Sequence, residues 1–208
     1  MTAQVFLLSP ASCTGKSVRL LLERRTTTDL AARLQSHRGV PIAEVFEWIS
    51  GLYFRGKLAY ARAFADPPAG CAGVQVITPG RGLLPSEETI TLDELHSIAA
   101  VSADPLDRRF REPLVRHAEQ LAEALGERDR VVLLGSVATG KYLDPLLQVL
   151  GGRLHVVQEF IGRGSLSRGG LLLRCVAARE QLTYVPAAGA PRHGKRPPRL
   201  PRRRSEPS

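Results

Sequence analysis

The stretch VVLLGSVATGK, residues 131–141, contains the two features that decide the fold of this chain. Its first four residues are apolar, which is typical of a buried strand. Gly135 ends this run, and small residues lead through Gly140 and Lys141 into a helical pattern between about 139 and 150. A buried strand that passes through a glycine turn into a helix is the repeating unit of a parallel α/β sheet.

Three more apolar runs of similar length predict strands over 4–8, 74–77 and 154–157, and a last run over 182–185 predicts an edge strand. Helical patterns separate them; one begins at Thr91-Leu92-Asp93-Glu94, a capping box. We therefore expect an α/β fold: a three-layer, doubly wound, mostly parallel sheet of about four to five strands with helices on both faces. Glycine-rich loops over 78–88 and 162–170 would meet in a cleft at the carboxyl ends of the strands.

Composition favours one domain with an appendage. The chain has 208 residues, 43% of them hydrophobic, and a formal charge of +9, which excludes wholesale disorder and a collagen or disulfide scaffold. Residues 190–208 combine proline with seven basic side chains and one acidic side chain. We expect a domain over 1–189 and a disordered basic tail over 190–208 that attracts polyanions, or that only keeps the protein soluble.

The cysteines and the apolar runs bear on compartment. Cys13, Cys71 and Cys175 are far apart and show no metal-ligand spacing. No apolar run approaches the roughly 20 residues that span a bilayer. The sequence therefore predicts a cytoplasmic protein with reduced thiols, no membrane segment, no metal and no cofactor.

Two segments resemble the P-loop pattern GxxxxGK[ST], whose backbone N–H groups and lysine hold a phosphate. The first ends in Gly15-Lys16-Ser17 but has Pro10 at the position of the first glycine. The second has Gly135, Gly140 and Lys141 at the right spacing, but Tyr142 replaces the Mg²⁺-binding hydroxyl. This argues against an active P-loop NTPase. It leaves an anion site that would use Gly135, Ser136, Thr139, Gly140, Lys141 and Lys16, or glycines that only permit a tight turn.

Other basic residues extend this prediction. Arg163 and Arg168 in the loop over 162–170, and Arg81 in the loop over 78–88, would clamp a phosphate or carboxylate. Tyr53 would stack on a base while Arg55 and Lys57 meet phosphate. The alternative interpretations are solvated surface loops and a half-buried tyrosine.

Candidates for covalent or acid–base catalysis are few. Glu159 follows a predicted strand and is the one carboxylate proposed for a cleft. Ser9 and Cys13 lie at a strand end, but no GxSxG elbow frames either residue.

The order of these features resembles a diffuse α/β group that includes bacterial peroxide-stress proteins and the glycosylase-like domain of archaeosine synthase. The matching residues are Cys13, Leu52-Tyr53, Thr78-Pro79, Gly82-Leu83 with Pro85, and Gly135 with Tyr142. The chain departs from the group at Gly80-Arg81, where the group has Lys-Tyr. The resemblance implies a three-layer fold and the handling of a nucleobase or nucleic acid, and it carries over no single activity.

These observations lead to one main hypothesis and two alternatives. The main one is a protein that binds a nucleotide or a nucleic-acid phosphate in a strand-end cleft. The first alternative is a glycosylase- or transglycosylase-like enzyme acting on an N-glycosidic bond, with Glu159 as acid/base. The second is an interaction protein that acts through its basic tail.

Overall fold

The computed structural model describes residues 2–13, 15–198 and 200. Its main sheet has six strands in these residues. In spatial order they are β4 (Gly82–Pro85), β3 (Val74–Thr78), β1 (Gln4–Leu8), β6 (Arg130–Leu134), β7 (Leu154–Val157) and β8 (Tyr184–Pro186). The four central strands are parallel, and β4 and β8 are antiparallel edges. The predicted α/β class with a mostly parallel sheet is confirmed.

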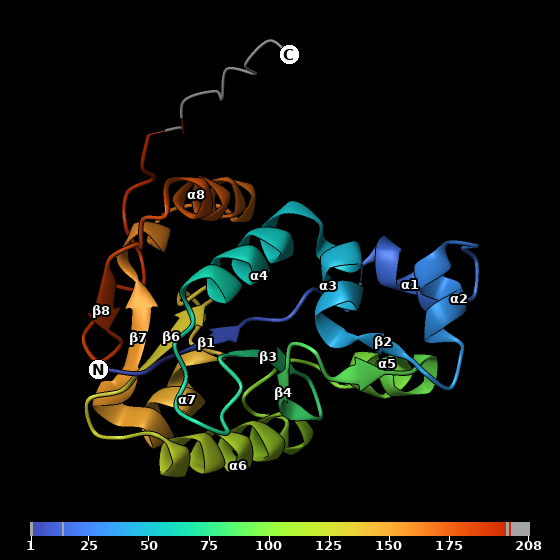
Figure 1. Cartoon of the computed structure of the whole chain (residues 1–208), viewed down its shortest axis with the longest axis horizontal. Coiled ribbons are helices and arrows are strands. Elements are labelled where there is room, and N and C mark those ends of the chain that lie inside the picture. The colour runs from blue at the N-terminus through green and yellow to red at the C-terminus, as the bar shows by residue number, and fades with distance from the viewer. Residues whose placement is uncertain (1, 14, 199, 201–208) are drawn as a thin grey trace.

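Helices cover both sides of this sheet (Figure 1). On one side lie α4 (Leu52–Phe64) and α8 (Ser165–Ala178), and on the other lie α6 (Arg108–Ala124) and α7 (Leu143–Leu150). A second group of elements projects beyond the sheet edge near β3 and β4. It consists of α1 (Lys16–Leu22), α2 (Asp29–Leu34), α3 (Ile42–Ser50), α5 (Leu92–Ala99) and a two-stranded ribbon of β2 (Val40–Pro41) and β5 (Thr89–Ile90).

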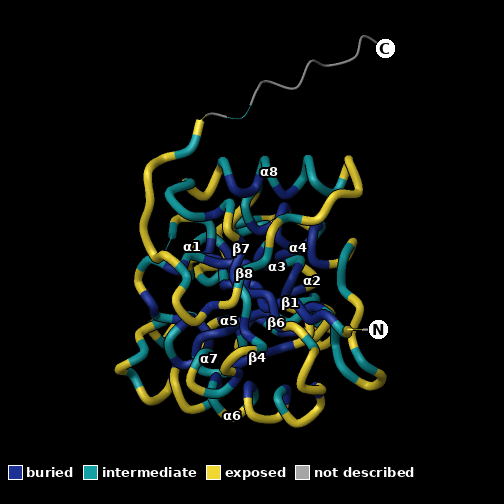
Figure 2. The backbone as a smooth tube through the Cα atoms, turned by 90° about the vertical axis from the view of Figure 1, so that its left-hand side faces the viewer, coloured by how far each residue is buried: buried dark blue, intermediate teal, exposed yellow. Residues whose placement is uncertain are grey.

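Alternation along the central strands explains why both sides are covered. In β1, Phe6 and Leu8 belong to the apolar core beneath α4 and α8. Val5 and Leu7 belong to the core beneath α6 and α7. Successive strand residues point to opposite faces, and every residue of β1 is buried, as the dark blue centre of Figure 2 shows. A strand with both faces apolar requires a layer of helices on each face.

Two glycines bring α4 and α8 close together. A Cβ on Gly56 would lie 2.7 Å from the carbonyl oxygen of Gly169, and a Cβ on Gly169 would lie 2.8 Å from that of Leu52. The backbones therefore touch where these helices cross. This close packing holds α4 over the carboxyl end of β1, where Lys57 of α4 meets Ser9.

The structure agrees with some of the predicted caps and loops and differs from others. The capping box of Thr91 and Glu94 is formed. The loop predicted over 78–88 contains β4, because a turn over residues 79–81 lets the chain pair back on β3. The loop predicted over 162–170 is wrong for its second half, since α8 begins at Ser165 despite Gly169 and Gly170. Packing against α4 outweighs the low helix propensity of glycine there.

The predicted tail over 190–208 lies partly in the described residues. Arg192 forms an ion pair with Asp144 of α7, Nη2 to Oδ1 2.5 Å. The backbone around Lys195 packs against Gly162, where a Cβ would clash with the Lys195 carbonyl oxygen. The first part of the predicted tail thus contacts the sheet domain. Residues 199 and 201–208 lie outside the described residues.

Candidate functional site

The loops after β1 and β6 line one cavity at the carboxyl edge of the sheet. β1 connects to β3 on one side, and β6 lies on its other side, so strand order reverses between β1 and β6. This is the switch point at which open α/β sheets bind ligands. The cavity has a volume of about 500 Å³, and its lining residues are Pro10, Ala11, Ser12, Cys13, Pro79, Ala99, Ala100, Val101, Ser102, Ala103, Lys141 and Tyr142.

The lining of this strand-end cavity has a single charge in the described part of the chain. Lys141 provides it, and the other lining residues are small, apolar or hydroxylic. The Lys141 Nζ lies 4.8 Å from the centre of the Tyr142 ring. Tyr142 itself is buried, in edge contact with Phe110 of α6 at 6.1 Å between ring centres. Burial raises the pKa of the Tyr142 hydroxyl above its ordinary value, so this hydroxyl stays protonated.

The turn after β6 differs from a P-loop. α7 begins at Leu143, so Thr139, Gly140 and Lys141 precede the helix. Gly140 has φ +67° and donates its N–H to the Val137 carbonyl. A Cβ on Gly140 would clash with the Asp144 carboxylate, which pairs with Arg192. The Asp144 carboxylate therefore lies directly beside Gly140.

The remaining residues of the turn are divided between interior and surface. Gly135 is buried, and a Cβ there would lie 3.0 Å from the Ser9 Cβ. Ser136 is half-buried and Thr139 is exposed. Of the five residues predicted from this motif, Lys141 is the one that lines the strand-end cavity in the described residues.

The lysine of the first Thr-Gly-Lys segment, Lys16, does not reach the strand-end cavity. Lys16 is exposed, as the first residue of α1, and it is not among the lining residues of the cavity. Ser12 and Cys13 of the same segment do line it. Burial raises the pKa of the Cys13 thiol to about 11, so little thiolate forms at neutral pH, and thiolate is the reactive species. This disfavours Cys13 as a nucleophile.

The predicted contact of Lys57 with phosphate requires an accessible side chain, but Lys57 is buried. Its side chain is 1% exposed, and its Nζ donates to the Ser9 carbonyl and lies 2.9 Å from the Ser9 Oγ. The Nζ also lies 4.7 Å from the centre of the Tyr53 ring and 4.8 Å from that of Phe54. Burial, with a smaller contribution from the positive charge of Arg168, lowers the pKa of Lys57 to about 7.

Tyr53 and Arg168 border the same buried lysine. The Tyr53 hydroxyl is buried and has no hydrogen-bond partner within the described residues. Burial raises its pKa, and the nearby Arg168 partly offsets this. Arg168 is buried, and its Nε and Nη2 donate to the Phe160 carbonyl at 3.1 and 2.7 Å. Neither residue is among the lining residues of the strand-end cavity as the structure describes it.

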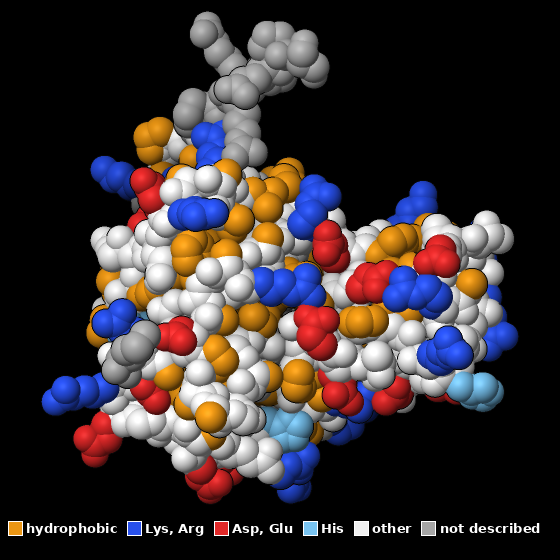
Figure 3. Space-filling view, in the orientation of Figure 1, with side chains coloured by type: hydrophobic (Ala, Val, Ile, Leu, Met, Phe, Trp, Pro, Cys, Tyr) orange, Lys and Arg blue, Asp and Glu red, His pale blue; other side chains and the backbone are white. Residues whose placement is uncertain are grey.

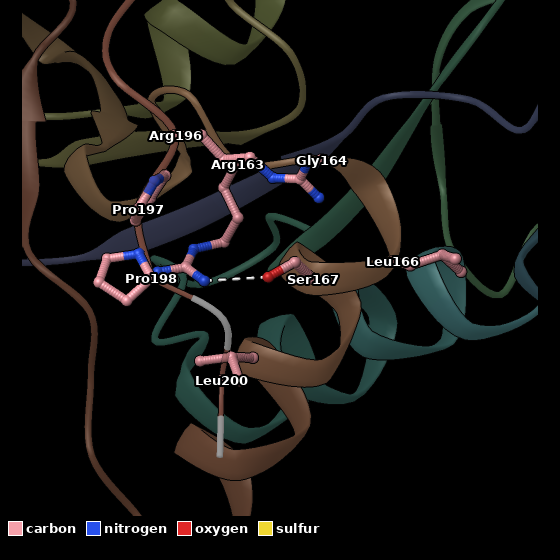
Figure 4. Close-up of a pocket in the computed structure, with 8 residues that line it drawn as sticks. All are labelled: Arg163, Gly164, Leu166, Ser167, Arg196, Pro197, Pro198 and Leu200. Carbon is pink, nitrogen blue, oxygen red and sulfur yellow. Dashed lines mark hydrogen bonds between the residues drawn. The ribbon is translucent and has the colours of Figure 1, made fainter. Parts of the chain in front are cut away.

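The other predicted basic residues lie apart from the cavity. Arg163 donates to the Ser167 Oγ at 2.9 Å and lines a separate pocket of about 270 Å³ with Arg196 and Leu200 (Figure 4). Arg81 is paired with Glu94, Nη1 to Oε1 2.7 Å, beside a pocket that Arg108, Arg109 and Arg116 also line. Arg55 is exposed on α4. Blue and red side chains are interspersed on the face in Figure 3, so this face carries no broad patch of one sign.

Glu159 is engaged in a structural contact. Its carboxylate accepts the backbone N–H of Thr183, at 3.0 Å to Oε1, in the segment that leads into β8. It is not among the residues that line the strand-end cavity. The carboxylate on which the glycosidase alternative depends thus holds the edge strand in place.

The pairing of Ser9 with Lys57 was missed from the sequence, although a signal for it exists. Lys57 lies three residues after Phe54 and four before Ala61, on the apolar side of the helix. A lysine on an inward face is rarely fully buried without a polar partner. The helical spacing of Phe54, Lys57 and Ala61 predicts that Lys57 faces the protein interior.

A scan of family models found no match, and searches of curated proteins and of solved structures found none either. Among the described residues, no helix is long and apolar enough to cross a membrane. The same residues contain no group of three His, Cys, Asp or Glu side chains that could hold a metal ion.

Proposed function

We propose that this protein binds a nucleotide in the strand-end cavity, with the phosphate against Lys141. One observation carries the proposal: a cavity at the switch point whose described lining has one cation and no carboxylate. Such a lining favours an anion, because no lining acid repels it. The proposal treats the chain as a three-layer, doubly wound fold, for which this is the expected ligand position.

Size and polarity support a ligand with both a ring and a phosphate. A volume of about 500 Å³ lies within the range of small-molecule sites. Pro10, Pro79 and Val101 offer apolar walls against which a base can pack, and Ser12 and Ser102 add hydroxyls. A mononucleotide matches this combination better than inorganic phosphate, which would leave the apolar walls unused. The resemblance to nucleobase-handling proteins points in the same direction.

The experiment is a thermal-shift titration of the full chain with AMP, CMP, GMP and UMP at 0.15 M salt. A ligand at 100 times its Kd adds about 2.7 kcal/mol to the free energy of unfolding, which raises the Tm. Mononucleotides are used because the basic C-terminal residues attract longer nucleic acids without specificity.

Lys141→Met is the test variant, and Lys16→Met is its matched control. Loss of a charge-assisted hydrogen bond costs about 1.5–3 kcal/mol, so Lys141→Met should weaken binding about 10- to 100-fold. Lys16→Met removes the same charge from an exposed helix start outside the cavity and should leave binding unchanged. Equal affinity of both variants, or no shift with any mononucleotide, would refute the proposal.

A further inference from the structure

A buried serine–lysine pair, Ser9 and Lys57, lies next to the strand-end cavity. Ser9 follows β1 directly, and its Oγ is 2.9 Å from the Nζ of Lys57 on α4. Ser9 is 7% exposed and Lys57 is 1% exposed. Within the described residues, both hydrogen bonds of Lys57 go to Ser9, and it forms no ion pair with a carboxylate.

An ammonium group in these surroundings is unfavourable. The charge of a buried lysine is expensive to desolvate unless a carboxylate compensates it. Two aromatic rings near 4.7 Å provide part of the compensation, and the positive charge of Arg168 works against it. The neutral amine is therefore readily reached, and a neutral amine accepts a proton from a hydroxyl at hydrogen-bond distance. This is how a nucleophilic serine is activated by a lysine.

Tyr53 adds a hydroxyl whose own proton has no acceptor among the described residues, because the neighbouring Arg168 can only donate. Its hydroxyl is buried without a partner in the described residues, and its ring lies against Lys57. The Tyr53 ring is also in edge contact with that of Phe160, at 6.5 Å between ring centres. A buried donor that lacks an acceptor is unfavourable. A ligand oxygen would remove that cost.

We infer that Ser9 and Lys57 form a nucleophile–base pair for acyl transfer from a carboxylic ester, with the Tyr53 hydroxyl as the donor to the carbonyl oxygen. The ester would reach Ser9 from the strand-end cavity, whose wall includes Pro10, the next residue after Ser9. The inference uses the same cavity as the proposed nucleotide site but other residues, because nucleotide binding uses Lys141.

The reaction is balanced with water as the only co-reactant. The Ser9 Oγ attacks the ester carbonyl carbon while its proton passes to the Lys57 amine. The C–O bond to the alkoxy group then breaks, and the Lys57 ammonium returns the proton to the leaving alcohol. Water hydrolyses the acyl-serine by the same route, with Lys57 again accepting and returning a proton, and the carboxylic acid leaves.

The test uses p-nitrophenyl acetate, a small ester, on the full chain. Release of p-nitrophenol gives the rate, and mass spectrometry after quenching in acid locates the acetyl group. Trypsin leaves residues 1–16 as one peptide, because Lys16 is the first basic residue. Fragmentation of this peptide separates Ser9 from Ser12 and Cys13. Hydroxylamine removes an acetyl ester from serine but leaves the acetyl amides of surface lysines.

We expect acetyl on Ser9 that hydroxylamine removes. Ser9→Ala should abolish the release of p-nitrophenol that the native chain catalyses, and Ser36→Ala, which changes an exposed serine just after α2, should not. Lys57→Met should slow acetylation of Ser9 about 10²- to 10⁴-fold, the usual contribution of a general base, with Lys16→Met as its control. Ser9→Ala removes one atom, so it keeps the test valid where Lys57→Met fails to fold.

The pH dependence of Ser9 acetylation distinguishes Lys57 as a general base from Lys57 as a purely structural hydrogen-bond donor. Acetylation of Ser9 should rise with pH and level off above about pH 7, because the neutral form of Lys57 is required. A structural Lys57 would produce no such profile. The inference is overturned by a native chain without acetyl on Ser9, or by acetylation that is equally fast in Lys57→Met.

Discussion

The turn after β1 and the turn after β6 share a Thr-Gly-Lys triplet, but their backbones run differently. Gly15 is extended, with φ −77° and ψ 171°, and Lys16 starts α1 pointing into solvent. Gly140 has φ +67°, so the chain reverses there and Lys141 lies over the Tyr142 ring at the cavity. Identical residue types thus reach opposite surroundings, because one glycine adopts a conformation that other residues rarely take.

The largest difference in stability between the two turns is expected at the residue that follows each lysine. This residue is Tyr142 in the turn after β6 and Ser17 in the turn after β1. Tyr142 is buried against Phe110, whereas Ser17 is half-buried. Tyr142→Ala should lower the free energy of unfolding by about 3–5 kcal/mol, as for other large buried aromatics. Ser17→Ala should change it by less than about 0.5 kcal/mol. Urea denaturation measures both, and comparable losses would mean that the second turn is no better packed than the first.

The next largest difference in stability is expected between alanine substitutions of the two glycines, Gly140 and Gly15. Gly140→Ala places a Cβ in a left-handed backbone and against the Asp144 carboxylate, so we expect a loss of about 1–3 kcal/mol. Gly15→Ala meets only the Ser12 carbonyl oxygen, at 3.9 Å, in an ordinary conformation. It should be neutral or stabilising by about 0.4–1 kcal/mol. Denaturation midpoints of the two variants in one buffer measure this difference in stability. A destabilised Gly15→Ala would contradict the described turn.

The buried cation at the end of β1 predicts a dependence on pH. Burial lowers the pKa of Lys57 to about 7 in the folded state, against about 10.4 in an unfolded chain. Between these values the unfolded chain binds a proton that the folded chain does not. Stability therefore rises with pH, by up to about 1.4 kcal/mol per pH unit.

Lys57→Met removes this titration. The free energy of unfolding of the native chain minus that of Lys57→Met should increase from pH 7 to pH 9. Taking the difference cancels other groups that titrate in this range. Lys16→Met controls for the loss of a positive charge at an exposed position. A difference that stays constant with pH would show that Lys57 is not desolvated.

The smallest effect is expected at the ion pair that attaches the C-terminal segment to the turn after β6. Arg192 and Asp144 are both about half exposed, and such pairs contribute about 0–1 kcal/mol. A double-mutant cycle with Arg192→Ala and Asp144→Ala should give a coupling energy in that range, decreasing at higher salt. A coupling well above 1 kcal/mol would show that this segment is a firmer part of the domain than its exposure indicates.

Local sequence patterns were sufficient for most elements. The four parallel strands fall at the predicted runs, and the helix start at Thr91 follows from its capping box. The start of α8 could not be read locally, because glycines at 169 and 170 argue against a helix. Gly169 is needed where α8 touches α4, which is a tertiary requirement.

The site was predicted only in outline. The motif after β6 predicted a strand-end cleft with Lys141, and Lys141 lines the strand-end cavity. Arg81, Arg163, Arg168 and Glu159 lie in contacts away from the cavity. Side-chain type indicates what a residue can bind. It does not indicate whether a nearer carboxylate or carbonyl already binds it.

The sequence by itself determined the α/β class, the positions of the four parallel strands and the excess of positive charge, because these depend on local apolar runs and composition. Only the tertiary structure decided which lysine lies in solvent, which borders the cavity and which is buried against Ser9. The physical reason is that burial and pairing depend on what the fold places opposite a side chain. For Lys57 that partner lies 48 residues earlier in the chain.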